Sequence, residues 1–228
     1  MTKNHLKRIN APKTWPISRK ETTFTLRPNP GGHAMTQSMP LSILFRDALG
    51  IARTMRSIKT LLNTQEVLVN GKRRMRPEDT AGLMDVVSFP AIKTSYRILI
   101  DRRNTLKAVP VAGDEAGLIP SKVTSKTKVR GGKLQIGCHN GRTLLMEKGA
   151  PVIGSTLMLT PDNKTKEVFP LEKGASVLIT GGKHVGQHGT LKALENGSAT
   201  IKLADGEIMT GTEFVFVIGK AKPAIKVD

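Results

Sequence analysis

The sequence predicts an α+β protein with several domains: a small domain of two helices and a hairpin, a central all-β domain, and a C-terminal β domain. Three observations lead to this expectation. Apolar residues recur at helical spacing from residue 41, short alternating strands separated by turn residues follow from residue 95, and glycines cluster near residue 181. The segments that we expect are 1–40, 41–94, 95–173 and 174–228.

Positive charge limits the class of partner. The chain holds 36 Lys and Arg against 18 Asp and Glu, a formal net charge of +18. Such an excess indicates a polyanion, either nucleic acid or an anionic membrane face. We find no basic amphipathic helix and no polybasic cluster beside an anchor, so we expect nucleic acid and no membrane partner. Because aromatic residues make up only 4% of the chain, backbone and shape recognition is favoured over stacking of successive bases.

A cytoplasmic location is expected. The first residues, MTKNHLKRIN, lack the apolar region of a secretory signal, and no run of eighteen apolar residues occurs. The single cysteine, Cys138, excludes an internal disulfide framework and a Cys-rich zinc site, which fits a reducing compartment.

Residues 1–40 form a basic arm in which Glu21 is the one acid against seven bases. Five prolines and a Gly-Gly pair disfavour regular helix or sheet over most of it. The arm is either a solvated tail or an extension that orders on RNA. We favour the second, because Trp15 and Phe24 are unusual in a purely solvating tail. The candidate RNA contacts in the arm are Lys3, His5, Lys7, Arg8, Lys13 and Trp15.

Two short amphipathic helices follow the arm. The first has its apolar stripe between Leu41 and Leu49 and ends at Gly50. Thr54 is a plausible N-cap for the second, whose stripe includes Ile58 and Leu62. One flank of the second helix carries three cations spaced three residues apart: Arg53, Arg56 and Lys59.

A basic hairpin is expected next. Asn70-Gly71 is the strongest short hairpin signal, since both residues tolerate the positive φ of a type I′ turn. A strand is expected again at Leu83–Phe89. The bases that follow the turn are Lys72, Arg73, Arg74 and Arg76. The basic helix face and the basic loop together would suit phosphates on two strands of folded RNA.

These elements resemble a known module. The helix pair, EVLVNGKRR and GLMDVV are similar to the alpha-L-type RNA-binding domain, which also occurs in pseudouridine synthases, a tRNA synthetase and stress proteins. Farther on, KGASVLITGGKHVGQHGTLKAL resembles a KOW motif, the strand-loop-strand core of an SH3-like β-barrel. A barrel of that kind is therefore implied for residues 174–228. The RNA contacts expected from its loop are Gly181, Gly182, Lys183 and His184.

No metal site is expected in this loop. His184 and His188 are four residues apart, a spacing that brings two ligands together on a helix, whereas Gly186 and Gly189 make a helix improbable here. The sequence supplies no third ligand, because nothing in it links the Cys138-His139 pair to this segment.

The whole chain resembles one family. Both modules behind a basic arm, together with KNHLKRINAPKTW, RPNPGGH and FVFVIGKAKPAI, are similar to the small-subunit ribosomal protein family S-four-e, in its archaeal form because no long basic tail follows Lys226. The resemblance implies a structural constituent of the small ribosomal subunit that binds ribosomal RNA and neighbouring ribosomal proteins. It implies no catalytic residue, cofactor or small-molecule substrate, and a monomer outside the ribosome.

Three alternatives stay open at this point. An RNA-modifying enzyme of the pseudouridine-synthase kind would use the helical module for targeting, but acids such as Asp101, Asp114 and Glu147 have no recognisable catalytic setting. A KOW transcription factor would bind RNA polymerase, which the basic arm and helical module fit poorly. A ribosome-associated stress protein would leave the particle readily.

Overall fold

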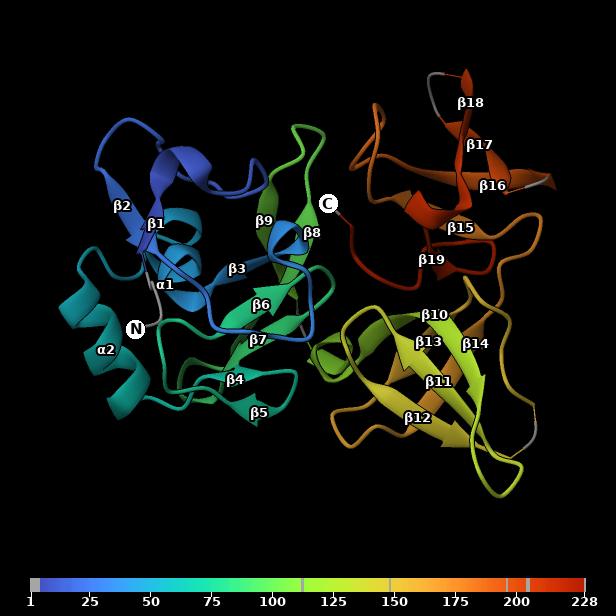
Figure 1. Cartoon of the computed structure of the whole chain (residues 1–228), viewed down its shortest axis with the longest axis horizontal. Helices are drawn as coiled ribbons and strands as arrows, with labels where there is room; N and C mark the ends of the chain where they lie inside the picture. The colour runs from blue at the N-terminus through green and yellow to red at the C-terminus, as the bar shows by residue number, and fades with distance from the viewer. Residues whose placement is uncertain (1–4, 112, 148, 196, 204–205, 228) are drawn as a thin grey trace. The chain divides into compact units, whose positions relative to one another are not determined.

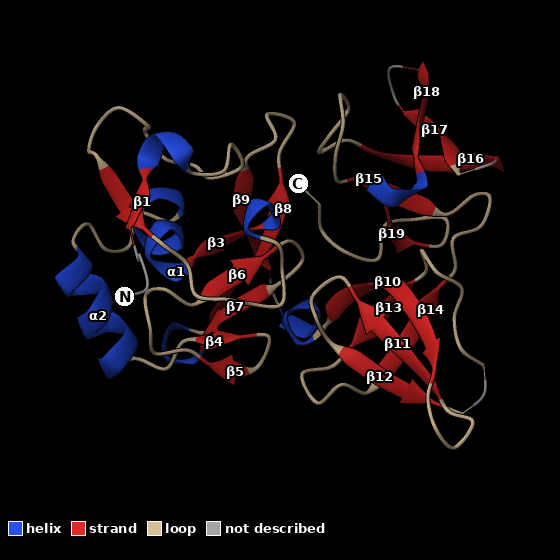
Figure 2. Ribbon diagram, viewed as in Figure 1, coloured by secondary structure: helices blue, strands red, loops and turns tan. Residues whose placement is uncertain are grey.

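The structure, a computed structural model, is mostly β, with two short helical segments (Figures 1 and 2). The chain divides into two compact units, residues 1–99 with 104–116 and residues 100–103 with 117–228. The expected combination of helices with several sheets is therefore present in coarse form. The described residues are 5–111, 113–147, 149–195, 197–203 and 206–227.

Within the described residues, nine strands of the first unit form three sheets. They are β1 (His5–Lys7), β2 (Phe24–Leu26), β3 (Ser38–Pro40), β4 (Leu68–Val69), β5 (Lys72–Arg73), β6 (Thr80–Gly82), β7 (Val86–Phe89), β8 (Thr94–Ile100) and β9 (Leu106–Val111). A five-stranded sheet has the order β5-β4-β7-β8-β9, and β1-β2 and β3-β6 form two-stranded sheets.

The helical segments lie where their apolar spacing predicts them. α1 (Leu41–Ile43) continues into a π-helical turn at Leu44–Ala48, and Gly50, with φ of 67°, follows it in the left-handed region that favours glycine. α2 (Met55–Thr64) begins after Thr54, whose side chain accepts a hydrogen bond from the Ser57 amide at 3.1 Å. None of the helices in the described ranges is long and apolar enough to cross a bilayer.

The basic arm is part of the core of the first unit. Ala11 and Trp15 are buried with Met39, Leu41 and Phe45 in one apolar cluster. The Trp15 Nε1 donates to the Ser38 carbonyl at 2.6 Å, so the indole is both packed and hydrogen-bonded. The expectation of an extension that orders on RNA is therefore wrong for this part of the arm, which is held by contacts within the chain.

The sheet of the first unit crosses the boundary expected at residue 94. β7 pairs with β8 from Val86↔Arg97 to Phe89↔Thr94, and β8 and β9 complete the sheet. The alternating pattern that starts at residue 95 predicts both of these strands in the central domain instead. The reason for the difference is that the apolar end of β8, Ile98–Ile100, indicates that the strand is buried but not which sheet buries it.

The second unit contains two five-stranded antiparallel sheets, shown from green to red in Figure 1. The strands of the first are β10 (Ile119–Lys128), β11 (Leu134–Cys138), β12 (Thr143–Met146), β13 (Thr156–Leu159) and β14 (Thr165–Phe169), in the order β12-β11-β10-β13-β14. Those of the second are β15 (Ser176–Ile179), β16 (His188–Glu195), β17 (Ser198–Leu203), β18 (Gly206–Gly211) and β19 (Val215–Gly219), in the order β18-β17-β16-β15-β19.

Polar and aromatic contacts join these two sheets. The ammonium of Lys122, on β10, donates hydrogen bonds to the carbonyls of Thr212 and Glu213 at 3.2 and 2.7 Å. The rings of His139 and Phe216 meet edge to face with centroids 5.2 Å apart. Burial lowers the pKa of Lys122 to about 8, although the nearby Glu213 opposes this shift.

Candidate nucleic-acid interface

α2 presents a cationic face to solvent. Ile58 and Leu62 are fully buried on one side of the helix, which fixes its orientation. Arg56 and Lys59 are exposed, as is Arg53 just before the N-cap. The helix therefore presents Arg56 and Lys59 to solvent, and Arg53 is exposed in the segment that precedes it.

The basic hairpin turns at Asn70 and Gly71. Their φ angles of 51° and 79° are those of a type I′ turn, which suits the twist of β4 and β5. Lys72, Arg73 and Arg76 are exposed and Arg74 is half-buried, with its amide donating to the Val67 carbonyl at 2.9 Å. The turn thus displays its bases on a short, hydrogen-bonded ribbon.

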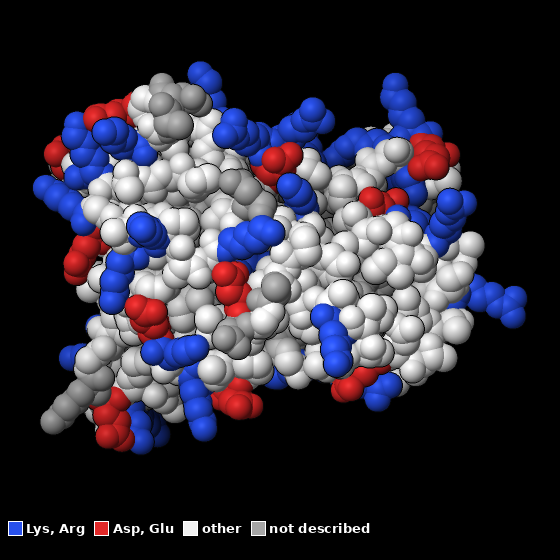
Figure 3. Space-filling view, turned by 180° about the vertical axis from the view of Figure 1, so that it is seen from behind, with Lys and Arg blue, Asp and Glu red and all other residues white. Residues whose placement is uncertain are grey.

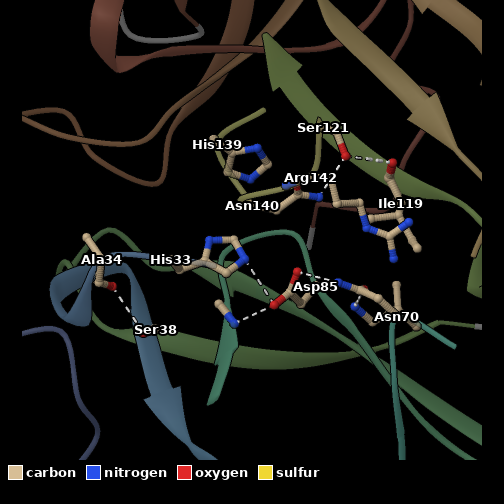
Figure 4. Close-up of polar contacts among 12 residues, drawn as sticks. His33, Ala34, Ser38, Asn70, Asp85, Ile119, Ser121, His139, Asn140 and Arg142 are labelled. Atoms are coloured by element: carbon tan, nitrogen blue, oxygen red, sulfur yellow. Dashed lines mark hydrogen bonds and ion pairs between the residues drawn. The ribbon is translucent and has the colours of Figure 1, made fainter. Parts of the chain in front are cut away.

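A buried carboxylate fixes the turn from behind (Figure 4). Asp85 accepts hydrogen bonds from the Asn70 side-chain amide and the Gly82 backbone amide, each at 2.7 Å. His33 Nε2 lies 3.0 Å from the same carboxylate. A Cβ on Gly82 would lie 2.3 Å from the His33 ring, so only glycine lets the imidazole approach this closely. We call His33, Asn70, Gly82 and Asp85 the Asp85 node.

Electrostatics show that the node stabilises the ionised carboxylate. Burial by itself would raise the pKa of Asp85, but the charge of His33 and the hydrogen bonds from His33, Gly82 and Asn70 together lower it below its ordinary value of 3.8. Asn70 also accepts from the Val86 amide at 2.9 Å. The turn residue is therefore held on both polar atoms of its side chain.

The cations of α2 and the hairpin have no acidic partner. Over the described ranges, no ion pair or side-chain hydrogen bond involves the guanidinium or ammonium groups of these exposed residues: Arg53, Arg56, Lys59, Lys72, Arg73 and Arg76. We call these six, with Arg74, the cationic set. Figure 3 shows Lys and Arg spread over one face, with acidic residues between them.

Fewer side chains of the arm are exposed, and so available to RNA, than its charge predicts. His5, Lys7 and Lys13 are exposed, and Lys3 lies outside the described residues. Arg8 is only 4% exposed and bonds to the Ser18 carbonyl at 2.6 Å and to Glu21 at 3.2 Å. Because Arg8 and Trp15 are buried and bonded within the fold, we withdraw both from the expected RNA contacts.

The glycine-rich loop lies between β15 and β16, as its pattern predicts. Gly182 has φ of 85°, Lys183 is exposed and His184 is half-buried. Among the described residues, the amides of Gly181 and Gly182 have no hydrogen-bond acceptor. A Cβ on Gly181 would lie 2.5 Å from the Phe214 ring, so the loop backbone packs directly on an aromatic side chain. The loop thus offers two amide donors and one free lysine.

The remaining candidate polar side chains are the two histidines of the loop and Cys138. His188 opens strand β16, so it does not share a helix with His184, and the described residues contain no cluster of three metal-ligating side chains. Burial raises the pKa of the Cys138 thiol to about 11, which Arg142 only partly opposes. The sequence patterns do not predict the Asp85 node, although RPNPGGH and GLMDVV, the stretches that carry the resemblances, contain His33 and Asp85.

Comparisons with known proteins identify the family. Residues 2–36 match the profile described as the RS4NT (NUC023) domain, and residues 92–168 match Ribosomal family S4e. Proteins named small ribosomal subunit protein eS4 from Methanocella arvoryzae and Archaeoglobus fulgidus are each 36% identical, over 99% of this chain and 98% of theirs. The crystal structure of 30S ribosomal protein S4e from Thermoplasma acidophilum is 30% identical with a TM-score of 0.71, covering 81% of this chain and 96% of that one. The chain belongs to the S4e family of small-subunit ribosomal proteins.

Proposed function

We propose that this protein is a structural constituent of the small ribosomal subunit, in the cytoplasm, and that it binds ribosomal RNA. The single observation that carries the proposal is the match over nearly the whole chain to proteins named small ribosomal subunit protein eS4. The unpaired cations of the first unit support it independently, because folded RNA is the polyanion that such a surface would meet in a ribosome.

The cationic set is the surface that we assign to RNA phosphates. Arginine can fork onto phosphate with two hydrogen bonds, which suits Arg53, Arg56 and Arg73. The hairpin is preorganised by the Asp85 node, so ordering it on RNA costs little conformational entropy. His5, Lys7, Lys13, Lys183, His184 and the amides of Gly181 and Gly182 complete the proposed contacts.

We also propose how the segments divide this work. Residues 1–40 brace the first unit, residues 41–94 act as an alpha-L-type RNA-binding domain whose sheet β8 and β9 complete, strands β10–β14 form the central β domain, and residues 174–228 form a KOW module of SH3-like kind. The type I′ hairpin after α2 supports the second assignment, and the five-stranded β15–β19 sheet with its glycine loop supports the last. The proposed role is architectural rather than enzymatic, with neighbouring ribosomal proteins as further partners and a monomer outside the ribosome.

Sedimentation tests the proposal. A tagged copy of the full chain, expressed in cells of a related archaeon, is expected to travel with the small subunit in a sucrose gradient and to stay there at moderate salt. A protein found only at the top of the gradient, or with RNA polymerase, would contradict the assignment. Catalytic modification of ribosomal RNA or tRNA by the purified protein would contradict the architectural role.

A further inference from the structure

The β1–β2 ribbon has one covered face and one open face. The strands pair antiparallel, with His5 opposite Leu26 and Lys7 opposite Phe24, so these four side chains share a face. Leu6 points to the other face and packs against the core of the first unit. The core therefore fixes the ribbon while leaving the outward face open.

That outward face displays an aromatic pair. Phe24 is 52% exposed, more than any other phenylalanine in the chain, and His5 is exposed as well. Their ring centroids are 5.4 Å apart and their planes are tilted by 57°. A phenyl ring exposed to this extent on a fixed ribbon presents a face on which a nucleic-acid base can stack.

The surroundings of the pair favour a nucleotide as that partner. Lys7 lies directly across the ribbon from Phe24 and forms no ion pair with the described residues. Glu21, the acid of the arm, is already paired with Arg8 at 3.2 Å. An aromatic ring beside an unneutralised ammonium suits a base that stacks and a phosphate that pairs.

We infer that the outward face of the β1–β2 ribbon binds an unpaired nucleotide of RNA, with its base stacked on Phe24 beside His5 and its phosphate bound by Lys7. This inference rests on the proposed RNA-binding function and specifies a stacked base at one position. The low aromatic content of the chain disfavours stacking of many successive bases, and a single platform is compatible with that composition.

Affinity measurements with full-length variants test the inference. The probe is deproteinised small-subunit ribosomal RNA, titrated at several salt concentrations. Phe24→Leu is expected to weaken binding by about 5- to 100-fold without changing the slope of log K against log salt, because stacking releases no counterions. Phe24→Tyr, which keeps the ring, is expected to bind like the parent. Lys7→Ala should make the slope shallower by about 0.7 to 0.9.

Ile92→Ala is the matched control, since Ile92 is 58% exposed on the same unit but has no role in the ribbon. Equal affinity of Phe24→Leu and the parent for the RNA would overturn the inference. If Phe24→Leu also failed to enter the small subunit while binding the RNA normally, the ribbon would instead contact a protein. Thermal unfolding of each variant checks that the ribbon stays folded. If the parent itself does not bind the RNA, the proposed function fails instead.

Discussion

The two units carry their positive charge in different ways. In the first unit, the exposed cations of α2 and the hairpin stand without acidic partners. In the second, three exposed lysines are paired, Lys133 with Glu147 at 3.1 Å, Lys192 with Glu207 at 2.7 Å and Lys220 with Glu167 at 3.3 Å, while others such as Lys183 form no ion pair with the described residues. Each phosphate that a cation neutralises releases counterions from the RNA, and a cation already paired with a carboxylate neutralises phosphate less, so we expect the unpaired cations of α2 and the hairpin to contribute more to the salt dependence of RNA binding than the three paired lysines.

The units also hold their loops differently. The basic hairpin is fixed by the Asp85 node, whereas the glycine-rich loop is fixed by close backbone approach. A Cβ on Gly186 would lie 2.5 Å from the Asp101 backbone, and one on Gly189 would lie 2.4 Å from the Lys202 carbonyl. In the first unit, a buried carboxylate thus holds the loop that carries the exposed cations. In the second, the glycine-rich loop packs closely because Gly186 and Gly189 have no Cβ.

The largest expected effect is on the arm. Trp15→Ala removes a buried indole and leaves the Ser38 carbonyl without its donor, so we expect the first unit to lose about 3 to 5 kcal/mol of unfolding free energy. Urea unfolding followed by circular dichroism measures this loss, with Lys13→Ala as the exposed control in the same segment. A variant as stable as the control would show the arm to be detachable.

The Asp85 node should have the next largest effect. Asp85→Ala leaves His33 and Asn70 without their shared acceptor, and we expect a loss of about 3 kcal/mol in the stability of the first unit. Glu66→Ala, which removes an exposed acid of the same unit, is the control. A small loss, equal to that of Glu66→Ala, would mean that the hairpin does not need the node.

The same node gives a pH dependence of known sign. Because the folded pKa of Asp85 lies below its ordinary value of 3.8, its contribution is fully present above that value and is lost as pH falls through the folded pKa. Acid unfolding of the parent should therefore be steeper below about pH 4 than that of Asp85→Asn. Identical acid limbs for the two proteins would contradict this assignment.

Sequence patterns predicted the elements whose signals are local. The Thr54 cap, the Gly50 stop, the Asn70-Gly71 turn and the glycine-rich loop each depend on residues within a few positions of one another. The wrong expectations concern long-range partners. The hydrogen bonds that hold Arg8 and Trp15 reach residues 10 and 23 positions away, and no periodicity reports such contacts.

The composition also does not distinguish buried cations from exposed ones. Arg97 adds to the basic count, yet its side chain is fully buried and donates to the Glu115 carbonyl at 2.8 Å. Burial lowers the pKa of Arg97, and the Glu115 carboxylate opposes that shift. A charge excess read from the sequence therefore overstates the surface available to RNA, because it counts structural and exposed cations alike.

The smallest expected stability effect lies in the second unit. The folded pKa of Lys122 is about 8, below its ordinary 10.5, so stability should rise as pH passes from 8 towards 9, by at most about 1.4 kcal/mol per pH unit. Above pH 9 the raised pKa of Cys138 acts in the opposite direction, which limits the useful window. Lys122→Met should flatten the rise measured by urea unfolding at pH 8 and 9. Equal slopes for variant and parent would contradict the assignment.

The salt dependence of binding to small-subunit ribosomal RNA tests the central claim most directly. The double variant Lys72→Ala/Arg73→Ala removes two unpaired cations of the first unit, and Lys192→Ala removes one that Glu207 already neutralises. We expect the double variant to make the slope of log K against log salt shallower by about 1.4 to 1.8, and Lys192→Ala to leave it nearly unchanged. Equal slopes for the two variants, or a larger change for Lys192→Ala, would contradict the account.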